Sequence, residues 1–290
     1  MNAFEKNGTV IVEGINDFNP VHTFLCGQCF RWNEESDGSF TGIAHDRVVN
    51  ISSENDKLII NNSNLDDFEC IWKNYLDLDT NYNSIKSILS NDDKPMTNAI
   101  NFGSGLKILN QDVYECLISF ILSTQNGIPR IKKIIEDMSR LFGKPILYNG
   151  KTYYAFPDLD TLSSLSVSDL EPIKAGYRSQ YIIGTAKAIK NGDIILNSLM
   201  DMPYENAKDE LLKLTGVGPK VANCVLLFSL KKREAFPVDV WVERVMKYFY
   251  VDNKASLNEI YNFGKEKFGN LGGFAQQYLF YYARENKLGN

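Results

Sequence analysis

The stretch NAKDELLKLTGVGPKVANCVLLFSL, residues 206–230, holds two segments of helical periodicity joined by a glycine-bearing turn. In LTGVG, residues 214–218, Gly216 and Gly218 permit a tight hairpin whose backbone N–H groups are free to meet a phosphate. The pattern predicts a helix-hairpin-helix. Taken alone, it is also compatible with a plain turn between two helices.

Lys220 falls in the first turn of the second predicted helix, directly after Pro219, a residue that this position tolerates. The positive end of a helix dipole disfavours the ammonium form of lysine, and the neutral amine is the form that acts as a nucleophile. Lys220 is therefore the candidate nucleophile, with a solvated or phosphate-binding side chain as the alternative. Cys224 lies four residues on, on the same helix face.

Asp239 follows Lys220 by nineteen residues and stands where a helix beginning at Val240 needs its N-cap. A fixed carboxylate beside a sugar can stabilise positive charge that develops at C1′. A purely structural cap is the alternative, and the two interpretations are compatible. The catalytic one requires Lys220 and Asp239 to face one cleft.

A lysine and a carboxylate on a helix-hairpin-helix suit the excision of a base from duplex DNA. The target nucleotide must leave the duplex and enter a cavity, where the lysine attacks C1′ and displaces the base. The resulting Schiff base allows strand scission by β-elimination. The residues thus predict a DNA N-glycosylase with lyase activity at apurinic or apyrimidinic sites.

Outward from this stretch, the chain shows two kinds of pattern. Residues 9–62 alternate apolar and polar side chains between turn residues, which predicts an antiparallel meander. Residues 66–91 change to helical spacing, a Gly-Ser-Gly break follows, and the remainder is helical in rhythm. We predict an α+β protein: an N-terminal antiparallel β-sheet domain with flanking helices over residues 1–105, then an all-α helical domain over residues 106–290.

Composition limits the class of protein. With 44% hydrophobic and 23% charged residues, the 290-residue chain is typical of a globular protein, and its start lacks the pattern of a signal peptide. A net charge of −5 argues against a strongly basic coat protein, although a local basic face would suffice for DNA. Cys26 and Cys29 form a lone C-x-x-C without further ligands, so a buried turn or strand is favoured over zinc. We expect a cytoplasmic protein with reduced thiols.

The G-V-G-x-K of the hairpin, with P-V-D nineteen residues after the lysine, resembles the helix-hairpin-helix DNA glycosylase superfamily. Within it the chain resembles the 8-oxoguanine DNA glycosylases. Four further segments carry the resemblance in order: CGQCFRW (26–32), DVYECLISFILSTQN (112–126), GYR (176–178), and FAQ through Phe280 (274–280). The resemblance implies base-excision repair, with 8-oxoguanine removed through a Lys220 Schiff base that Asp239 assists.

The resemblance also implies roles for other residues. Gly27 would offer its carbonyl to the N7–H of 8-oxoguanine, Gln276 would read the Watson–Crick edge, and Phe280 and Cys224 would cover the faces of the base. The implied opposite-base and wedge residues are Gln125, Arg130, Tyr177 and Arg178. The implied DNA-phosphate contacts are Gly216, Gly218, Val240 and Trp241, helped by basic residues such as Lys213, Lys231, Lys232 and Arg233. Core or surface positions are the structural alternatives for these side chains.

Two departures from the family pattern affect these roles. Gln125 stands where the family has Asn in the loop that fills the gap left by the base, and Trp241 stands where a phosphate-contacting His is common. No cysteine follows Cys224, so we expect no iron–sulfur cluster. The resemblance requires no cofactor, and it implies a structural monovalent cation on hairpin carbonyls near Val217.

The implied partner is double-stranded DNA with 8-oxoguanine opposite cytosine. We expect a monomer that does not associate with a membrane and that acts in a bacterial or archaeal cytoplasm. Two rival functions stay open. One is a monofunctional alkylated-base glycosylase, which activates water with the aspartate and lacks the lysine. The other is a non-catalytic helix-hairpin-helix DNA-binding protein, which would leave a duplex that contains the lesion unnicked.

Overall fold

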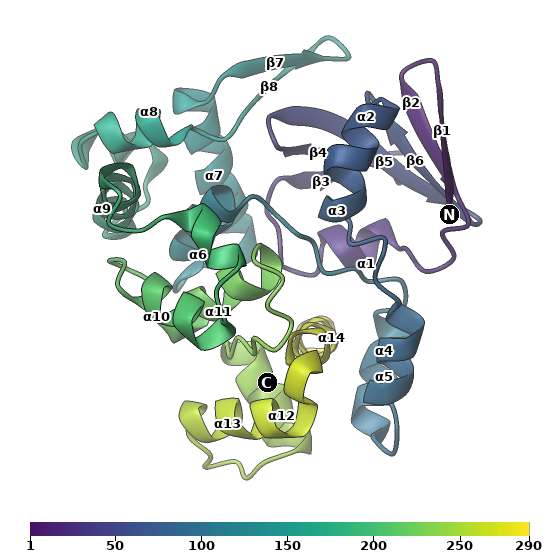
Figure 1. The fold of residues 1–290 in the computed structure, drawn as a ribbon. Helices are drawn as coiled ribbons and strands as arrows, with labels where there is room; N and C mark the ends of the chain where they lie inside the picture. Colours follow the sequence, from purple (N-terminus) through teal and green to yellow (C-terminus); the bar gives the residue numbers. More distant parts are fainter. Residues whose placement is uncertain (290) are drawn as a thin grey trace.

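The computed structural model describes residues 1–289 and confirms the predicted fold class, an antiparallel sheet followed by helices (Figure 1). The strands are β1 (Asn2–Lys6), β2 (Thr9–Glu13), β3 (Trp32–Glu34), β4 (Phe40–Ala44), β5 (Arg47–Glu54), β6 (Lys57–Asn61), β7 (Pro145–Tyr148) and β8 (Lys151–Tyr154). The α-helices are α1 (Pro20–Phe24), α2 (Leu65–Asp67), α3 (Lys73–Tyr75), α4 (Tyr82–Leu89), α5 (Lys94–Phe102), α6 (Val113–Ser123), α7 (Ile128–Phe142), α8 (Leu159–Ser164), α9 (Arg178–Asn191), α10 (Tyr204–Leu212), α11 (Pro219–Phe228), α12 (Val240–Phe249), α13 (Leu257–Phe268) and α14 (Gly272–Glu285). Short π and 3₁₀ segments are η1 (Phe68–Trp72), η2 (Ser168–Ile173), η3 (Leu196–Met200) and η4 (Gly269–Leu271).

The six-stranded sheet is not the simple meander that the alternation predicts. Its order is β1-β2-β6-β5-β4-β3, so β2 pairs with β6 instead of with β3, the next strand in sequence. Helix α1 lies between β2 and β3 in the chain, which removes the short connection that a hairpin needs. The register places Val10 opposite Ile60, and both side chains are fully buried. Only β3 to β6 form a meander.

A small hairpin interrupts the helical part of the chain. Strands β7 and β8 pair with each other through a turn at Asn149 and Gly150, whose φ angles are +48° and +71°. An Asn-Gly turn of this kind matches the twist of the two strands that it joins. In Figure 1 the hairpin extends away from the helices at the top of the molecule.

Two hydrophobic cores hold the molecule together. One lies under the sheet and contains Trp32 and Trp72, and the other fills the helical part. Met96 and Ala99 of α5 belong to the helical core, and α5 contacts α14 although it precedes the break at residues 103–105. The division of the chain after residue 105 stays a proposal about its organisation.

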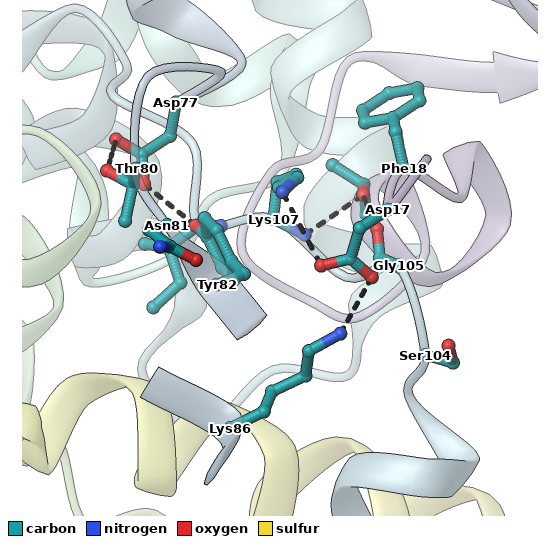
Figure 2. Close-up of polar contacts among 12 residues, drawn as sticks. Asp17, Phe18, Asp77, Thr80, Asn81, Tyr82, Lys86, Ser104, Gly105 and Lys107 are labelled. Carbon is teal, nitrogen blue, oxygen red and sulfur yellow. Dashed lines mark hydrogen bonds and ion pairs between the residues drawn. The ribbon is translucent and has the colours of Figure 1, made fainter. Parts of the chain in front are cut away.

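A polar cluster lies where the sheet meets the helices (Figure 2). Lys107 is 5% exposed, and its Nζ lies 3.8 Å from the ring centroid of Tyr82 and 3.7 Å from Oδ2 of Asp17. Lys86 Nζ binds the other oxygen of Asp17 at 2.9 Å. Burial lowers the pKa of Lys107, and the charge of Asp17 opposes this shift. The cluster connects the loop before α1 to α4 and to the segment that leads into α6.

No helix within residues 1–289 is long and apolar enough to cross a membrane.

Candidate active site

The predicted hairpin is present between α10 and α11. Gly216 has a φ of +82°, and a Cβ at this position would lie 2.5 Å from Cγ of Tyr181. Both the backbone and the ring therefore require glycine here. Gly218 is the N-cap of α11 and has open space around it. The unpaired backbone N–H groups at the start of a helix favour a phosphate.

Lys220 lies in the first turn of α11 and is partly buried. Its Nζ donates a hydrogen bond to Ser123 Oγ at 2.9 Å and lies 5.0 Å from the ring centroid of Phe120. Ser123 Oγ itself donates to the carbonyl of Phe120 at 2.7 Å. The hydroxyl proton is thus in use, so its oxygen can only accept from the lysine. This arrangement fixes the direction of the amine.

Asp239 is the N-cap of α12, as predicted. Its Oδ1 accepts from the backbone N–H groups of Trp241 at 3.0 Å and Val242 at 2.9 Å. Burial raises the pKa of Asp239, while these two N–H groups and the charges of Lys220 and Arg284 oppose the rise. The two backbone N–H groups fix the direction of the carboxylate.

One cavity of about 500 Å³ joins the sheet segment to the hairpin and to α14. Both Lys220 and Asp239 line it, which meets the requirement for a shared cleft. The other predicted site residues that line this cavity are Gly27, Gln125, Gly216, Gly218, Cys224, Val240, Gln276 and Phe280. The sequence thus predicted side chains from five distant segments that the fold brings together.

The base-recognition group surrounds the inner end of this cavity. Gly27 has a φ of +82°, and a Cβ there would lie 3.0 Å from a ring carbon of Phe280. Gln276 is 4% exposed, and its Oε1 has no hydrogen-bond partner among residues 1–289. Burial raises the pKa of the Cys224 thiol to about 11, and the charge of Lys220 opposes this rise. A buried, unpaired amide oxygen beside an aromatic ring suits a flat, polar ligand.

Of the opposite-base group, Gln125 lines the cavity, whereas the other three predicted residues, Arg130, Tyr177 and Arg178, do not. Tyr177 is 46% exposed and donates to Gln125 Oε1 at 3.2 Å, while Gln125 has a φ of +53°. Arg130 is exposed and donates to the carbonyl of Lys174 at 3.1 Å. Arg178 differs from these because it is 6% exposed and its Nε donates to the carbonyl of Thr124 at 2.7 Å. In this state Arg178 supports the loop that carries Gln125, and its reading of an orphaned cytosine stays a prediction.

Of the predicted phosphate contacts, Gly216, Gly218 and Val240 line the cavity, whereas Trp241 does not. Val240 is 52% exposed at the start of α12, and the Arg244 guanidinium lies 4.8 Å from the ring of Trp241. Two of the basic residues are engaged elsewhere: Lys232 donates to the carbonyl of Met200 at 2.8 Å, and Arg233 pairs with Asp77 at 3.3 Å. The remaining basic residues, Lys213 and Lys231, are exposed.

The described part of the chain holds no group of three or more His, Cys, Asp or Glu residues that could bind a metal ion. Cys26 and Cys29 are buried, and their thiols donate to the carbonyls of Thr23 and Phe24. The implied monovalent cation would instead bind backbone carbonyls near Val217, which is buried in the hairpin.

Three residues that the sequence analysis missed contact this site. Ser123 accepts a hydrogen bond from Lys220, and Gln277 and Arg284 donate to the loop that carries Gly27. A signal for Gln277 was present, because it is an amide within an otherwise apolar run of α14. Ser123 gave none, since a serine at the end of a helix is ordinary.

Comparisons with known proteins agree over nearly the whole chain. The family described as "8-oxoguanine DNA glycosylase, N-terminal domain" matches residues 10–117, and "HhH-GPD superfamily base excision DNA repair protein" matches residues 118–276. A "Probable N-glycosylase/DNA lyase" of Methanothermobacter thermautotrophicus is 33% identical over 217 residues, which is 68% of this chain and 69% of that protein.

Two solved structures are similar throughout. One is the 8-oxoguanine glycosylase/lyase of Clostridium acetobutylicum in complex with double-stranded DNA containing cytosine opposite 8-oxoguanine. It is 44% identical with a TM-score of 0.97, and the match covers 99% of each chain. The other is MBOgg1 in complex with a low affinity DNA ligand, 48% identical with a TM-score of 0.97 and 99% of each chain covered.

Proposed function

Because this chain belongs to the HhH-GPD superfamily of base excision DNA repair proteins, we propose that it excises 8-oxoguanine from duplex DNA and then cleaves the strand. The observation that carries the proposal is the shared cavity, in which Lys220 and Asp239 meet beside Gly27, Gln276 and Phe280. The 8-oxoguanine glycosylase/lyase to which the chain is similar supports the choice of substrate and of cytosine as the opposite base.

The chemistry begins at Lys220. Its amine nitrogen attacks C1′ of the extruded nucleotide, the N-glycosidic bond breaks, and the base leaves with the bonding electron pair and takes up a proton. The carboxylate of Asp239, fixed by two backbone N–H groups, stabilises the positive charge that develops at C1′. Ser123 directs the amine toward the cavity.

The second stage uses the same nitrogen. The sugar ring opens to a Schiff base between Lys220 and C1′, which makes a proton on C2′ acidic. Loss of this proton drives β-elimination, in which the C3′–O bond breaks and the 3′ phosphate leaves with its electrons. The strand is therefore cleaved only where the covalent adduct has formed.

Around the cavity we assign the remaining site residues as the resemblance implies. Gly27, Cys224, Gln276 and Phe280 would hold the base. Gln125, Arg130, Tyr177 and Arg178 would fill the gap in the duplex and contact the orphaned cytosine. The hairpin amides at Gly216 and Gly218 and the start of α12 at Val240 and Trp241 would bind phosphates.

No cofactor is needed for these steps. A monovalent cation on carbonyls near Val217 would serve only to reinforce the hairpin. We further propose that the protein acts as a monomer on chromosomal DNA in a bacterial or archaeal cytoplasm, which the sources of its relatives support.

The first experiment is borohydride trapping on a duplex that carries 8-oxoguanine opposite cytosine. We expect the native protein to give a covalent adduct, and Lys220→Gln to give none while it still binds the duplex. Lys57→Gln is the matched control, since this lysine of β6 pairs with Glu13 and does not line the cavity. No adduct and no base release from the native protein would exclude the proposal and favour the alkylated-base or non-catalytic alternatives.

A further inference from the structure

The loop of residues 25–28 is held by hydrogen bonds to its carbonyls. Gln277 Nε2 donates to the carbonyl of Cys26 at 3.0 Å, and Arg284 Nη2 donates to the carbonyl of Leu25 at 2.5 Å. On the other side, Gln111 Nε2 donates to the carbonyl of Gln28 at 2.8 Å. Three of the four carbonyls in this loop therefore have donors from distant segments.

Gly27 is the exception in this loop. No donor within residues 1–289 reaches its carbonyl, although the carbonyls on both sides of it are bound. Gly27 also lines the active-site cavity. An unpaired carbonyl between two fixed neighbours is an acceptor whose direction is set before any ligand arrives.

Gln277 and Arg284 lie seven residues apart on α14, which places them on one face of that helix. The same helix carries Gln276 and Phe280, which line the cavity. Gln277 is 1% exposed, and Arg284 Nη1 lies 2.9 Å from the point that a Cβ of Gly27 would occupy. The two donors thus fix the spacing between the Gly27 loop and the aromatic ring of Phe280.

A fixed carbonyl suits a distinction that rests on a single proton. At N7, 8-oxoguanine has an N–H donor where guanine has a lone pair. A rigid acceptor gains a hydrogen bond with the first and meets electrostatic repulsion from the second. A flexible loop could turn its carbonyl away, and it would then lose both the hydrogen bond to 8-oxoguanine and the repulsion of guanine.

We propose that Gln277 and Arg284 are positioning residues that set the discrimination between 8-oxoguanine and guanine by fixing the free carbonyl of Gly27. This inference rests on the proposed function and adds two residues to it. Gln277 lines the cavity, but its amide nitrogen donates to the carbonyl of Cys26, so it acts through the loop, as Arg284 does.

The test compares three substrates with the same enzyme under single turnover: 8-oxoguanine opposite cytosine, guanine opposite cytosine, and a preformed abasic site. In Gln277→Leu we expect 8-oxoguanine excision to fall about tenfold, which corresponds to the loss of one well-placed hydrogen bond. Guanine excision should stay the same or rise. Cleavage at the abasic site should stay within about twofold, because that reaction needs Lys220 and no base contact.

Arg284→Lys is the second variant, chosen because the charge of Arg284 also acts on the pKa of Asp239 and must be kept. It should lower the ratio of 8-oxoguanine to guanine excision in the same direction. Asn286→Ser is the matched control, since the exposed Asn286 lies at the same end of α14 and its side chain donates only to the carbonyl of Tyr282, at 2.9 Å. This control should leave the ratio unchanged.

Three outcomes would overturn the inference: an unchanged ratio in both variants, a parallel fall of excision and abasic-site cleavage, or an equal effect in Asn286→Ser. If Gln277→Leu loses its cooperative thermal unfolding, the result from Arg284→Lys decides. A native protein that excises no 8-oxoguanine at all contradicts the proposed function instead, so the two failures are distinguishable.

Discussion

At the scale of single residues, Ser123 holds the amine of Lys220, the proposed nucleophile, through one hydrogen bond. Its own proton goes to the carbonyl of Phe120, which leaves only lone pairs for Lys220. A lysine side chain whose tip is held in this way loses rotamer freedom, and a positioned amine attacks more often than a free one.

We therefore predict that Ser123→Ala slows Schiff-base formation about tenfold, a typical cost of losing one positioning contact. Ser123→Thr should recover most of the rate because it keeps the hydroxyl. The measurement is single-turnover trapping on the lesion duplex, with duplex affinity measured in parallel. Thr124→Val is the control, since the Thr124 hydroxyl has no hydrogen-bond partner in the described chain. Equal rates in Ser123→Ala and the native protein would contradict this role.

Local sequence was enough to find some residues of the site and not others. Lys220 was predictable because its positive charge is unfavourable at the start of α11. Asp239 was predictable because its carboxylate caps the start of α12. Ser123 was not predictable, because its meaning depends on a partner 97 residues away. The same holds for the burial of Arg178, which an exposed-looking Gly-Tyr-Arg sequence does not reveal.

At the scale of elements, backbone geometry determines which residues the hairpin between α10 and α11 can contain. Gly216 combines a positive φ with the Tyr181 ring at its Cβ position, whereas Gly218 has a φ of −98° and open space. These two glycines serve different purposes.

We predict that Gly216→Ala lowers duplex affinity at least tenfold and the free energy of unfolding by about 2 kcal/mol, because strain and overpacking act together. Gly218→Ala should change stability by less than about 0.5 kcal/mol. Fluorescence-anisotropy titration of an undamaged duplex and thermal unfolding measure the two effects. Equal losses of affinity and stability in the two variants would show that the positive φ of Gly216 does not require glycine.

The elements themselves were predictable where a local signal was strong. Helix α13 begins at a capping box of Ser256 and Glu259, and α6 begins at its Asp112 cap, as the sequence indicates. The pairing of β2 with β6 was not predictable, because strand partners are chosen by non-local packing of one buried face. The β7–β8 hairpin was missed although its Asn-Gly turn gives a signal, because the helical rhythm around it is stronger.

At the scale of the whole molecule, Arg31 fastens the sheet segment to the helices. It is 5% exposed, its Nη2 donates to the carbonyl of Tyr154, and its Nη1 lies 3.8 Å from Glu115. Burial raises the pKa of Glu115 to about 7, and Arg31 opposes the rise. Folding thus favours a protonated carboxyl at the junction.

A folded-state pKa above the unfolded value means that the contribution of Glu115 is fully present below pH 4.5 and is lost as pH rises through about 7. Between these two pH values the free energy of unfolding of the native protein should fall by about 3 kcal/mol through Glu115, at roughly 1.4 kcal/mol for each pKa unit. We predict that Glu115→Gln lacks this fall. Urea unfolding of both proteins from pH 5 to pH 8 measures it. The difference between the two proteins is the relevant quantity, because burial lowers the pKa of His45 and gives a dependence of opposite sign. Parallel curves would refute the prediction.

The contacts of α14 with the Gly27 loop also have a consequence for how the protein is made. Gln277 and Arg284 follow their partners by 251 and 259 residues, so these contacts have very high contact order. During synthesis at about 5–20 residues per second, the loop waits on the order of ten seconds or more for its donors to leave the ribosome. Until then the nascent chain exposes the aromatic and apolar surface that α14 will cover, which is the interval in which a chaperone would bind. If these contacts set the discrimination as proposed above, the ability to tell damaged from intact guanine is acquired late in the synthesis of each chain, after Lys220 has already been made.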